Sequence, residues 1–418
     1  MNNQATNSSR VVGLDAHPDS FTAAIIRGQT PAGAIVEKVF NRIPMRQLAR
    51  WAAKYLEAHD QVVLEASGNS FEVVRTLKAV DRRALVLESA HLGKLKEAHA
   101  NNDKISAVRI GKAFLAGTAK EVWVPDTLTQ ERRDWHHTYT KCVRRTTQVH
   151  LSIGSYLSDN GVRIAQGLPS CPSVRRLLLK HAKTWTARQW QVLEGKLLEL
   201  NHAEQQRDHW SSLMAQEVLQ DPLLLSMTRL CGIRDVIAFS IGAIIGDIHR
   251  FAGPKKLVAY LGLNPAFDDS GKGTWQGGIG GHGRRDLRGL LIEAAQSILR
   301  SDHPLAKWGK RLIARKSSMK LAVAAVARRL AVAIWYLMMG RWTALEEVDT
   351  RLKVKIGKII TKVGEQGLER LKKTRRQLRE DTIQALKTGR MYALEKGKQF
   401  QRTATDNPTT LAEEYGLA

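Results

Sequence analysis

Residues 10–26 read RVVGLDAHPDSFTAAII, two runs of β-branched and other apolar residues on either side of the polar turn AHPD. Such runs, bounded by turn residues, are typical of neighbouring strands joined by a short connection. The stretch AIVEKVF at residues 34–40 indicates a third strand of the same kind. Short connections favour antiparallel pairing, because parallel strands need a long crossover. The chain is therefore expected to begin with three antiparallel strands.

Helix and strand patterns alternate from there to about residue 125. Residues 45–59 form an amphipathic helix pattern, with apolar residues on one face. Strand patterns follow at 61–67, 84–89 and 121–125, with helix patterns between them at 71–80 and 102–117. Three antiparallel strands followed by alternating strands and helices is the order of a ribonuclease-H-like domain. We therefore expect an α/β domain of this class over residues 8–125.

The chain reads as helical after that domain. Helix patterns run over 127–159 and, after the break GLPSCPS, over 186–219. In the second pattern leucines recur at three-to-four spacing, at Leu193, Leu197 and Leu200. This stripe fits a coiled-coil seam between protomers or domains, and a helix pair within one chain is an alternative. We assign residues 126–220 to a long helical connector.

A third, mostly helical unit is expected over residues 221–345. Within it LCGIRDVIAFSIGAIIGDI, residues 230–248, resembles a helix-hairpin-helix, an element whose turn presents backbone N–H groups to phosphate. The turn lies at Gly232, and Arg234 stands where a second glycine is expected. A helical hairpin that belongs only to the core is therefore an equal alternative.

The charge of the chain favours a polyanionic partner. Its 418 residues carry 65 Lys and Arg against 40 Asp and Glu, a formal net charge of +25. Basic residues are dense in a tail predicted over 346–418, where residues 351–400 hold fifteen Lys and Arg against five Asp and Glu. Nucleic acid is the partner that this balance favours. A protein that is simply basic is the alternative.

Other classes of protein fit less well. The start MNNQATNSSR is polar, unlike a signal peptide, and the longest apolar run, residues 330–339, is shorter than the ~20 residues that span a bilayer. The cysteines lack CxxC spacing and predict neither a disulfide framework nor a zinc site; they are Cys142, Cys171 and Cys231. We expect no membrane association and a cytoplasmic location.

Three acids stand at the ends of predicted elements in the first domain. Asp15 ends the first strand, Glu65 ends the strand QVVLE, and Asp103 begins the helix NDKISAV. In a ribonuclease-H-like sheet these places converge on one edge, where carboxylates repel one another unless a cation is bound. Two Mg²⁺ ions ~4 Å apart, held by such acids, can clamp the attacking and leaving oxygens of a phosphodiester. Each acid alone could equally be an ordinary residue at the end of an element.

Residues 268–288, DDSGKGTWQGGIGGHGRRDLR, form a glycine-rich loop before a helix pattern. The loop contains a literal GxGxxG, but the βαβ context of a dinucleotide site is missing. A flexible backbone that leads into a helix N-terminus still favours anions. The predicted nucleic-acid-binding side chains are Lys272, Arg284, Arg285 and Arg288, and arginine suits phosphate because its fork binds two oxygens.

Ser270 lies in this loop, and two interpretations of it stay open on the residues alone. A Ser-Gly pair is most often part of a turn. A serine hydroxyl is a poor nucleophile unless a base or a metal activates it. His282 is the local histidine, and a metal ion held by the carboxylate domain could serve instead.

Several motifs occur in an order that resembles a known family. They are GLDAH, VLEAS, NNDKISA, LCGIRDVIAFSIGAIIGDIHRF, LVAYLGLNP, DDSG and GIGGHGRRDLRGLLIEAA. The chain is similar to the DEDD transposases of bacterial insertion sequences, the IS-one-ten family, with its IS-eleven-eleven branch as a closer relative. The resemblance covers roughly residues 10–345.

The resemblance implies a RuvC-like domain, a helical connector and a transposase domain with a nucleophilic serine. Family members resemble DNA recombinases guided by a structured bridge RNA that pairs with donor and target DNA. By motif, Asp15, Glu65 and Asp103 are catalytic acids that hold Mg²⁺, and Ser270 forms a phosphoserine link to DNA. Carboxylates of another protomer complete the site, which implies a homo-oligomer, a dimer or tetramer.

One position departs from the family pattern. The family carries a second aspartate three residues after the first in its third motif, and this chain has Ser106 there. Another acid substitutes, one metal suffices, or this copy is inactive. The competing functions are a RuvC-like metal-dependent nuclease that forms no covalent intermediate and an inactive nucleic-acid-binding remnant.

Overall fold

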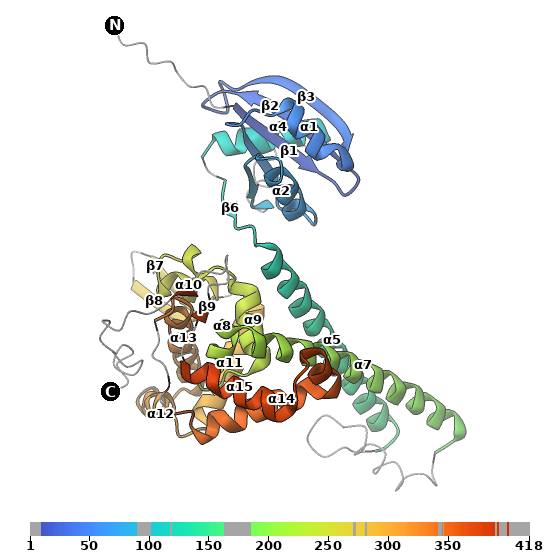
Figure 1. Cartoon of the computed structure of the whole chain (residues 1–418), viewed down its shortest axis with the longest axis vertical. Helices are drawn as coiled ribbons and strands as arrows, with labels where there is room; N and C mark the ends of the chain where they lie inside the picture. The colour runs from blue at the N-terminus through green and yellow to red at the C-terminus, as the bar shows by residue number, and fades with distance from the viewer. Residues whose placement is uncertain are drawn as a thin grey trace. The chain divides into compact units, whose positions relative to one another are not determined.

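The computed structural model describes residues 10–89, 102–117, 119–162, 185–270, 273–280, 282–341, 345, 347–388, 391–392 and 399–400. The chain divides into two compact units, Met1–Asp126 and Thr127–Ala418 (Figure 1). Lys272 lies outside the described residues, and so does the side chain of Ser270.

One six-stranded sheet forms the centre of the first unit, in the order β3-β2-β1-β4-β5-β6. β1 and β2 pair antiparallel, as do β2 and β3, whereas β1–β4 and β4–β5 are parallel. The predicted mixed α/β character of this unit is confirmed. The elements are β1 (Arg10–Ala16), β2 (Ser20–Arg27), β3 (Ile35–Pro44), the short η1 (Met45–Gln47), β4 (Gln61–Glu65), β5 (Ala84–Leu87) and β6 (Glu121–Val122).

Helices cover both faces of the sheet. Successive residues of a strand point to opposite faces, so a strand with consecutive apolar residues presents apolar side chains on both of them. On one side Leu14 of β1 packs in a cluster with α1 (Leu48–Tyr55) and α2 (Ser70–Lys78). On the other side Val11 packs with α4 (Asp103–Leu115). The alternation of buried residues along β1 therefore gives each face its own hydrophobic cluster.

Gly13 lets α4 lie directly against β1. A Cβ atom at Gly13 would be 1.9 Å from the carbonyl oxygen of Ala107 and 2.8 Å from the backbone nitrogen of Gly111. Only a residue without a side chain permits this approach of two backbones. The contact fixes the start of α4 relative to the end of β1, where two of the predicted acids lie.

The second unit begins with two long helices packed side by side, α5 (Thr127–Asp159) and α7 (Ala187–Gln220) (Figure 1). Both agree with the predicted helices to within one residue. Leu193 and Leu200 are fully buried in a cluster with Ile153 of α5. The leucine stripe of the sequence is thus used by a helix pair within one chain.

A helical core that includes a β-hairpin follows. Its largest cluster surrounds Phe239, which is fully buried in α9. The predicted mostly helical character of this region is confirmed. The elements are α8 (Pro222–Met227), α9 (Asp235–Ile245), η2 (Ile248–Arg250), α10 (Pro254–Tyr260), β7 (Pro265–Ser270), β8 (Gly273–Ile279), α11 (Arg285–Leu299), α12 (Pro304–Lys316) and α13 (Met319–Met338).

Among the described helices, α13 is long and apolar enough to cross a membrane by length and composition. Its most apolar stretch is 61% buried within the structure, and it packs against α10, α11 and α12. A helix that is apolar around most of its circumference and covered by neighbours is what a protein core requires.

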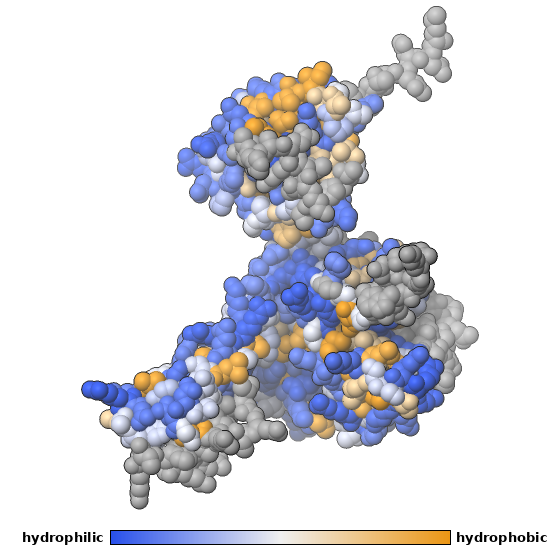
Figure 2. Space-filling view, turned by 180° about the vertical axis from the view of Figure 1, so that it is seen from behind, coloured by the Kyte–Doolittle hydropathy of each residue, from blue (hydrophilic) through white to orange (hydrophobic). Residues whose placement is uncertain are grey.

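The residues predicted as a basic tail include two helices, α14 (Thr350–Leu371) and α15 (Arg375–Thr388). Ile356 and Ile359 of α14 are fully buried in a cluster that also contains residues of α7 and α8. Two short strands, Met391–Tyr392 (β9) and Gln399–Phe400 (β10), pair antiparallel. The basic side chains thus lie on helices whose apolar faces belong to the core. On the face of the molecule drawn in Figure 2, hydrophilic surface predominates over hydrophobic surface.

Candidate functional site

Two of the predicted acids lie at the same end of two neighbouring parallel strands. β1 pairs with β4 so that Leu14 lies opposite Leu64. Asp15 and Glu65 come next in each strand, and both are half-buried. The structure therefore places these two predicted acids at the same end of adjacent strands.

Asp103 reaches the same place as the first residue of α4. The helix is capped by Asn102, whose side chain accepts a hydrogen bond from the backbone N–H of Ile105 at 2.9 Å. Capping satisfies an N–H group that the helix itself leaves unpaired. The cap and the close approach at Gly13 together position Asp103 beside β1.

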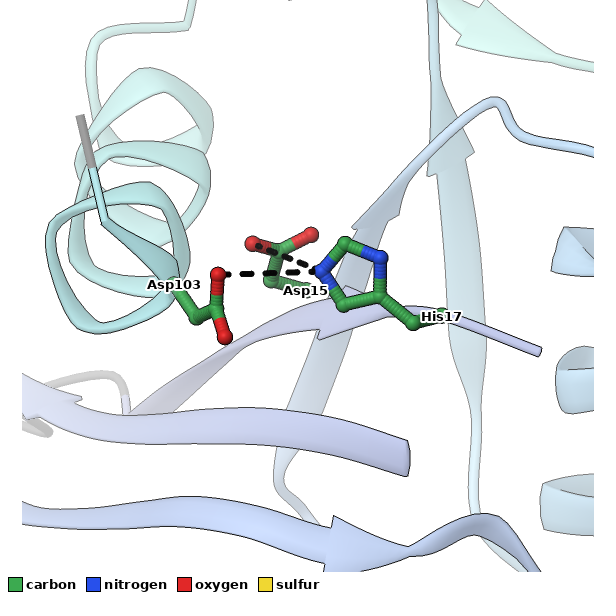
Figure 3. A group of neighbouring side chains, drawn as sticks. All are labelled: Asp15, His17 and Asp103. Atoms are coloured by element: carbon green, nitrogen blue, oxygen red, sulfur yellow. Dashed lines mark ion pairs between the residues drawn. The ribbon is translucent and has the colours of Figure 1, made fainter. Parts of the chain in front are cut away.

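Asp15, His17 and Asp103 form one cluster, drawn in Figure 3. One ligand atom from each lies within 4.8 Å of the other two. The Nε2 atom of His17 is 3.8 Å from Asp15 Oδ2 and 3.8 Å from Asp103 Oδ1. Carboxylate oxygens suit Mg²⁺ and Mn²⁺, and imidazole is a common metal ligand. The donor set fits a divalent cation.

The sequence interpretation did not include His17. A signal for it exists, because it follows Asp15 by only two residues, directly after the end of β1. Its backbone carbonyl accepts a hydrogen bond from Asn69 Nδ2 at 2.9 Å, which ties the residue after β1 to the turn after β4.

Electrostatics at Asp15 favour a bound cation. Burial raises the pKa of Asp15 above its usual value, and the charges of Asp103 and Glu65 raise it further, while those of His17 and Arg109 lower it. A carboxylate that is partly removed from water and close to other acids is costly to ionise, and a nearby positive charge offsets that cost.

Ser106 lies one turn beyond Asp103 in α4 and is buried, with 7% of its surface exposed. Arg109 Nη2 lies 3.5 Å from Ser106 Oγ, at the limit of a hydrogen bond. On the other side of the cluster, Arg42 Nε donates to Asp103 Oδ2 at 3.2 Å. Guanidinium groups therefore adjoin this acidic edge from two elements.

The glycine-rich loop of the second unit is a hairpin. β7 and β8 pair antiparallel, and the last pair in the register joins Ser270 to Gly273. Ser270 is thus the last residue of β7, next to the turn. The serine was predicted either as a turn residue or as a nucleophile, and its backbone position at the tip of the hairpin is compatible with both.

The hairpin is held at its base by a close backbone crossing. The backbone N–H of Arg284 donates to Tyr260 O at 2.9 Å, and that of Gly280 to Asn264 O at 3.3 Å. Gly262 has a φ of 67°, and a Cβ atom there would lie 1.9 Å from His282 O. The crossing requires glycine for both conformation and space.

Arg288 completes this base from α11. Its Nη1 atom donates to the carbonyl oxygens of Gly262 at 3.2 Å, Gly280 at 3.1 Å and His282 at 2.8 Å. We call these contacts, with the backbone crossing, the arginine clasp. The Nη1 group of this predicted phosphate ligand is committed to the protein's own loop.

The other two predicted arginines differ from Arg288. Arg284 donates from Nε and Nη2 to both carboxylate oxygens of Asp286, at 3.2 and 2.7 Å. Arg285 is exposed at the start of α11. Among the three, Arg285 therefore presents the most accessible side chain at this helix N-terminus.

A buried histidine lies behind Asp286, which the sequence interpretation also missed. Ser240 Oγ donates to Val236 O at 2.7 Å and so accepts from His136 Nδ1 at 3.0 Å. His136 Nε2 lies 3.9 Å from Asp286 Oδ2, and burial lowers the pKa of this histidine. His136 lines a cavity of about 570 Å³ together with Asp286 and residues of α9 and α14.

Comparison with known proteins identifies the class to which this second unit is similar. Residues 224–308 match the family model described as "Transposase IS116/IS110/IS902 family". This range runs from α8 to α12 and includes the β7–β8 hairpin and the arginine clasp.

Two curated relatives extend the similarity beyond that range. The chain is 27% identical over 288 residues to "Transposase for insertion sequence element IS1111A" of Coxiella burnetii, covering 68% of this chain and 78% of the relative. It is 24% identical over 282 residues to "Putative transposase y4qE" of Sinorhizobium fredii, covering 68% of each. Over these ranges the chain is therefore similar to insertion-sequence transposases of the IS110/IS116/IS902 family.

Proposed function

We propose that this chain cuts and rejoins the DNA strands of an insertion sequence through a covalent link to Ser270. One observation carries the proposal. The region that matches the transposase family contains the β7–β8 hairpin, with Ser270 at the end of β7 and a purpose-built clasp at its base. A hairpin that is fixed at its base and carries Ser270 at the end of its first strand suits a nucleophile that must meet a large substrate.

The reaction exchanges one ester for another. Ser270 Oγ bonds to a DNA phosphorus while the bond from that phosphorus to a deoxyribose oxygen breaks, and the serine proton leaves with the new DNA hydroxyl. A hydroxyl of another strand then attacks the phosphoserine and restores the serine. The energy of the phosphodiester is kept in the covalent link, so rejoining requires no ATP.

The first unit supplies the carboxylates for this chemistry. Asp15 and Asp103, with His17 and with Glu65 on the adjacent strand, are the residues that would hold Mg²⁺. When bound, the ion stabilises negative charge on the phosphate and on the oxygens that attack or leave. We propose that these acids act together with Ser270 of another protomer, so that the working enzyme is a dimer or tetramer.

Nucleic acids are the proposed partners. The net charge of +25 favours a polyanion, and the basic helices α14 and α15 add charge beside the transposase region. Donor and target DNA are the substrates, and a structured bridge RNA is the proposed guide. Arg285 contacts the phosphate backbone, while Arg284 and Arg288 keep the loop in place.

The test is a covalent adduct. The chain would be co-expressed with the non-coding DNA that flanks its element, incubated with end-labelled donor and target DNA and Mg²⁺, and separated on a denaturing gel. A labelled protein band that is absent in Ser270→Ala supports the proposal, and Asp15→Asn should weaken the band.

Two other results would each favour a different function. Cut DNA without a labelled band, unchanged in Ser270→Ala, indicates a metal-dependent nuclease that uses the carboxylates of the first unit alone. Salt-sensitive binding to DNA and RNA without cutting or joining under any divalent cation indicates a nucleic-acid-binding remnant.

A further inference from the structure

Charge at the acidic edge of the first unit limits what can bind there. Asp15, Glu65 and Asp103 contribute three negative charges when ionised. Two guanidinium groups oppose them, since Arg42 pairs with Asp103 and the charge of Arg109 acts on Asp15. Among the described residues, these acids and guanidinium groups together carry a small net negative charge, far from the four positive charges that two divalent cations bring.

The position of Ser106 matters for the same reason. It is the residue of α4 one turn from Asp103, and it is buried. A serine hydroxyl is neutral and is a weaker ligand for a hard cation than a carboxylate. No negative charge is therefore added on this turn of the helix.

Arg109 occupies the next turn of the same helix. It is half-buried, its Nη2 group lies 3.5 Å from Ser106 Oγ, and its charge favours the ionised form of Asp15. A fixed cation that stabilises an acidic ligand does locally what a metal ion does. Unlike a metal ion, it is part of the chain and cannot dissociate.

We propose that the first unit binds a single divalent cation, through Asp15, His17 and Asp103, and that the Arg109 guanidinium beside Ser106 takes the place of a second cation. This proposal rests on the proposed metal-dependent function and specifies how its metal site is built. Arg109 is a positioning residue here, because it acts through Asp15 and through the charge balance of the site.

The effects of Ser106 and Arg109 on cation binding depend on each other. An acid at 106 would attract a second cation, whereas a guanidinium at 109 repels one. The charge of the half-buried Arg109, which acts on Asp15, also offsets part of the mutual repulsion of the acids. With a neutral residue at Ser106 and a positive charge at Arg109, the charge balance of the site thus suits one ion.

The test counts bound Mn²⁺ in the full-length protein by electron paramagnetic resonance, with Mn²⁺ alone as the probe. The wild type is expected to bind one Mn²⁺ per chain, and Asp15→Asn should weaken that binding at least about tenfold. Arg109→Gln should tighten binding of the first ion several-fold, because it removes a repelling charge. The double variant Ser106→Asp/Arg109→Gln should bind two ions and give a spin-coupled spectrum.

Each contrary result overturns the proposal. Two Mn²⁺ per wild-type chain, or none, contradicts the single-ion site. Weaker binding in Arg109→Gln assigns Arg109 a purely structural role, and one ion in a folded double variant shows that something else excludes the second. Circular dichroism checks folding, and Arg50→Gln, an exposed arginine of α1, is the matched control.

The adduct assay separates this proposal from the function on which it rests. One Mn²⁺ per chain without any serine adduct keeps the single-ion site and rejects serine recombination. A serine adduct formed by a chain that binds two Mn²⁺ supports serine recombination and rejects the single-ion site.

Discussion

The two units of this chain position their candidate residues by different physical means. In the first unit the acids lie at the ends of regular elements, and sheet topology brings those ends together. In the second unit Ser270 lies in a hairpin whose base depends on one arginine and on glycines at a backbone crossing. Sheet topology can therefore bring several candidate residues together, whereas a single candidate residue in a hairpin depends on a dedicated support at the base of that hairpin.

Gly13→Ala tests how far the first site depends on helix–sheet contact, and it should have the largest effect. The new Cβ would meet the Ala107 carbonyl at 1.9 Å. We expect a loss of roughly 3 kcal/mol or more in the stability of the first unit, because backbone must move. Hydrogen exchange over β1 and α4, read by mass spectrometry, measures it.

Gly68→Ala is the matched control for that change. A Cβ at Gly68 meets nothing within 4 Å, so its exchange should match the wild type. Equal protection in Gly13→Ala and Gly68→Ala would show that the packing of α4 on β1 does not hold the acids in place.

Arg288→Lys tests the support of the second site. A lysine side chain is one bond shorter, so its ammonium group does not reach the position of Arg288 Nη1, and carbonyl groups at the hairpin base lose their donor. We expect a loss of about 2 kcal/mol in urea unfolding and slower adduct formation. Arg285→Lys, which changes an exposed neighbour, should leave the unfolding midpoint in place. Equal shifts of the unfolding midpoint in Arg288→Lys and Arg285→Lys would show that the arginine clasp does not stabilise the hairpin.

Lys355 gives the second unit a pH dependence in the alkaline range. Its Nζ donates to the carbonyls of Thr228 at 2.6 Å and Leu230 at 3.0 Å, and burial lowers its pKa from 10.5 to about 8. Between these values the folded chain releases a proton that the unfolded chain keeps. Stability should therefore rise with pH, by up to about 1.4 kcal/mol per pH unit from this group.

Urea unfolding of wild type and Lys355→Met from about pH 7 to about pH 10 isolates this contribution. The difference in unfolding free energy between them should grow with pH above about 8. A difference that stays constant over this range would mean that Lys355 keeps its ordinary pKa in the folded chain. Lys353→Met on the same helix is the control.

Asn102→Ala should have the smallest effect and sharpens the account of the first site. It removes the side-chain cap of α4 and should cost about 1 kcal/mol. Because the capping residue directly precedes Asp103, Mn²⁺ affinity should also fall modestly, in proportion to fraying of the first turn. Asn102→Asp restores a capping acceptor and should recover stability. If alanine and aspartate behave alike, the cap does not position Asp103.

Much of the fold followed from local patterns. The mixed sheet followed by helices, and the bounds of α5 and α7, agree with hydrophobic periodicity. The similarity to insertion-sequence transposases also agrees with motifs read from the sequence. These features could be predicted because strand alternation and helix periodicity depend on neighbours along the chain.

Interactions between distant residues could not be read in the same way. His17 was absent from the predicted site, because an exposed histidine after a strand has many possible roles. Arg288 was predicted to bind phosphate, since a loop rich in glycine and arginine favours anions. Its Nη1 group instead contacts three carbonyls of the loop, and a one-dimensional pattern does not specify the direction of a long side chain.

Residue patterns along the chain were enough to predict the mixed sheet followed by helices, the positive charge, and the placement of Asp15, Glu65 and Asp103 at element ends. Three-dimensional packing was needed to show that His17 joins Asp15 and Asp103, that Arg109 lies beside Ser106, and that Arg288 contacts the base of the hairpin. The difference lies in the distance along the chain over which each kind of interaction acts. Propensity and periodicity act over a few residues, whereas ligand geometry and charge balance arise from segments that packing brings together.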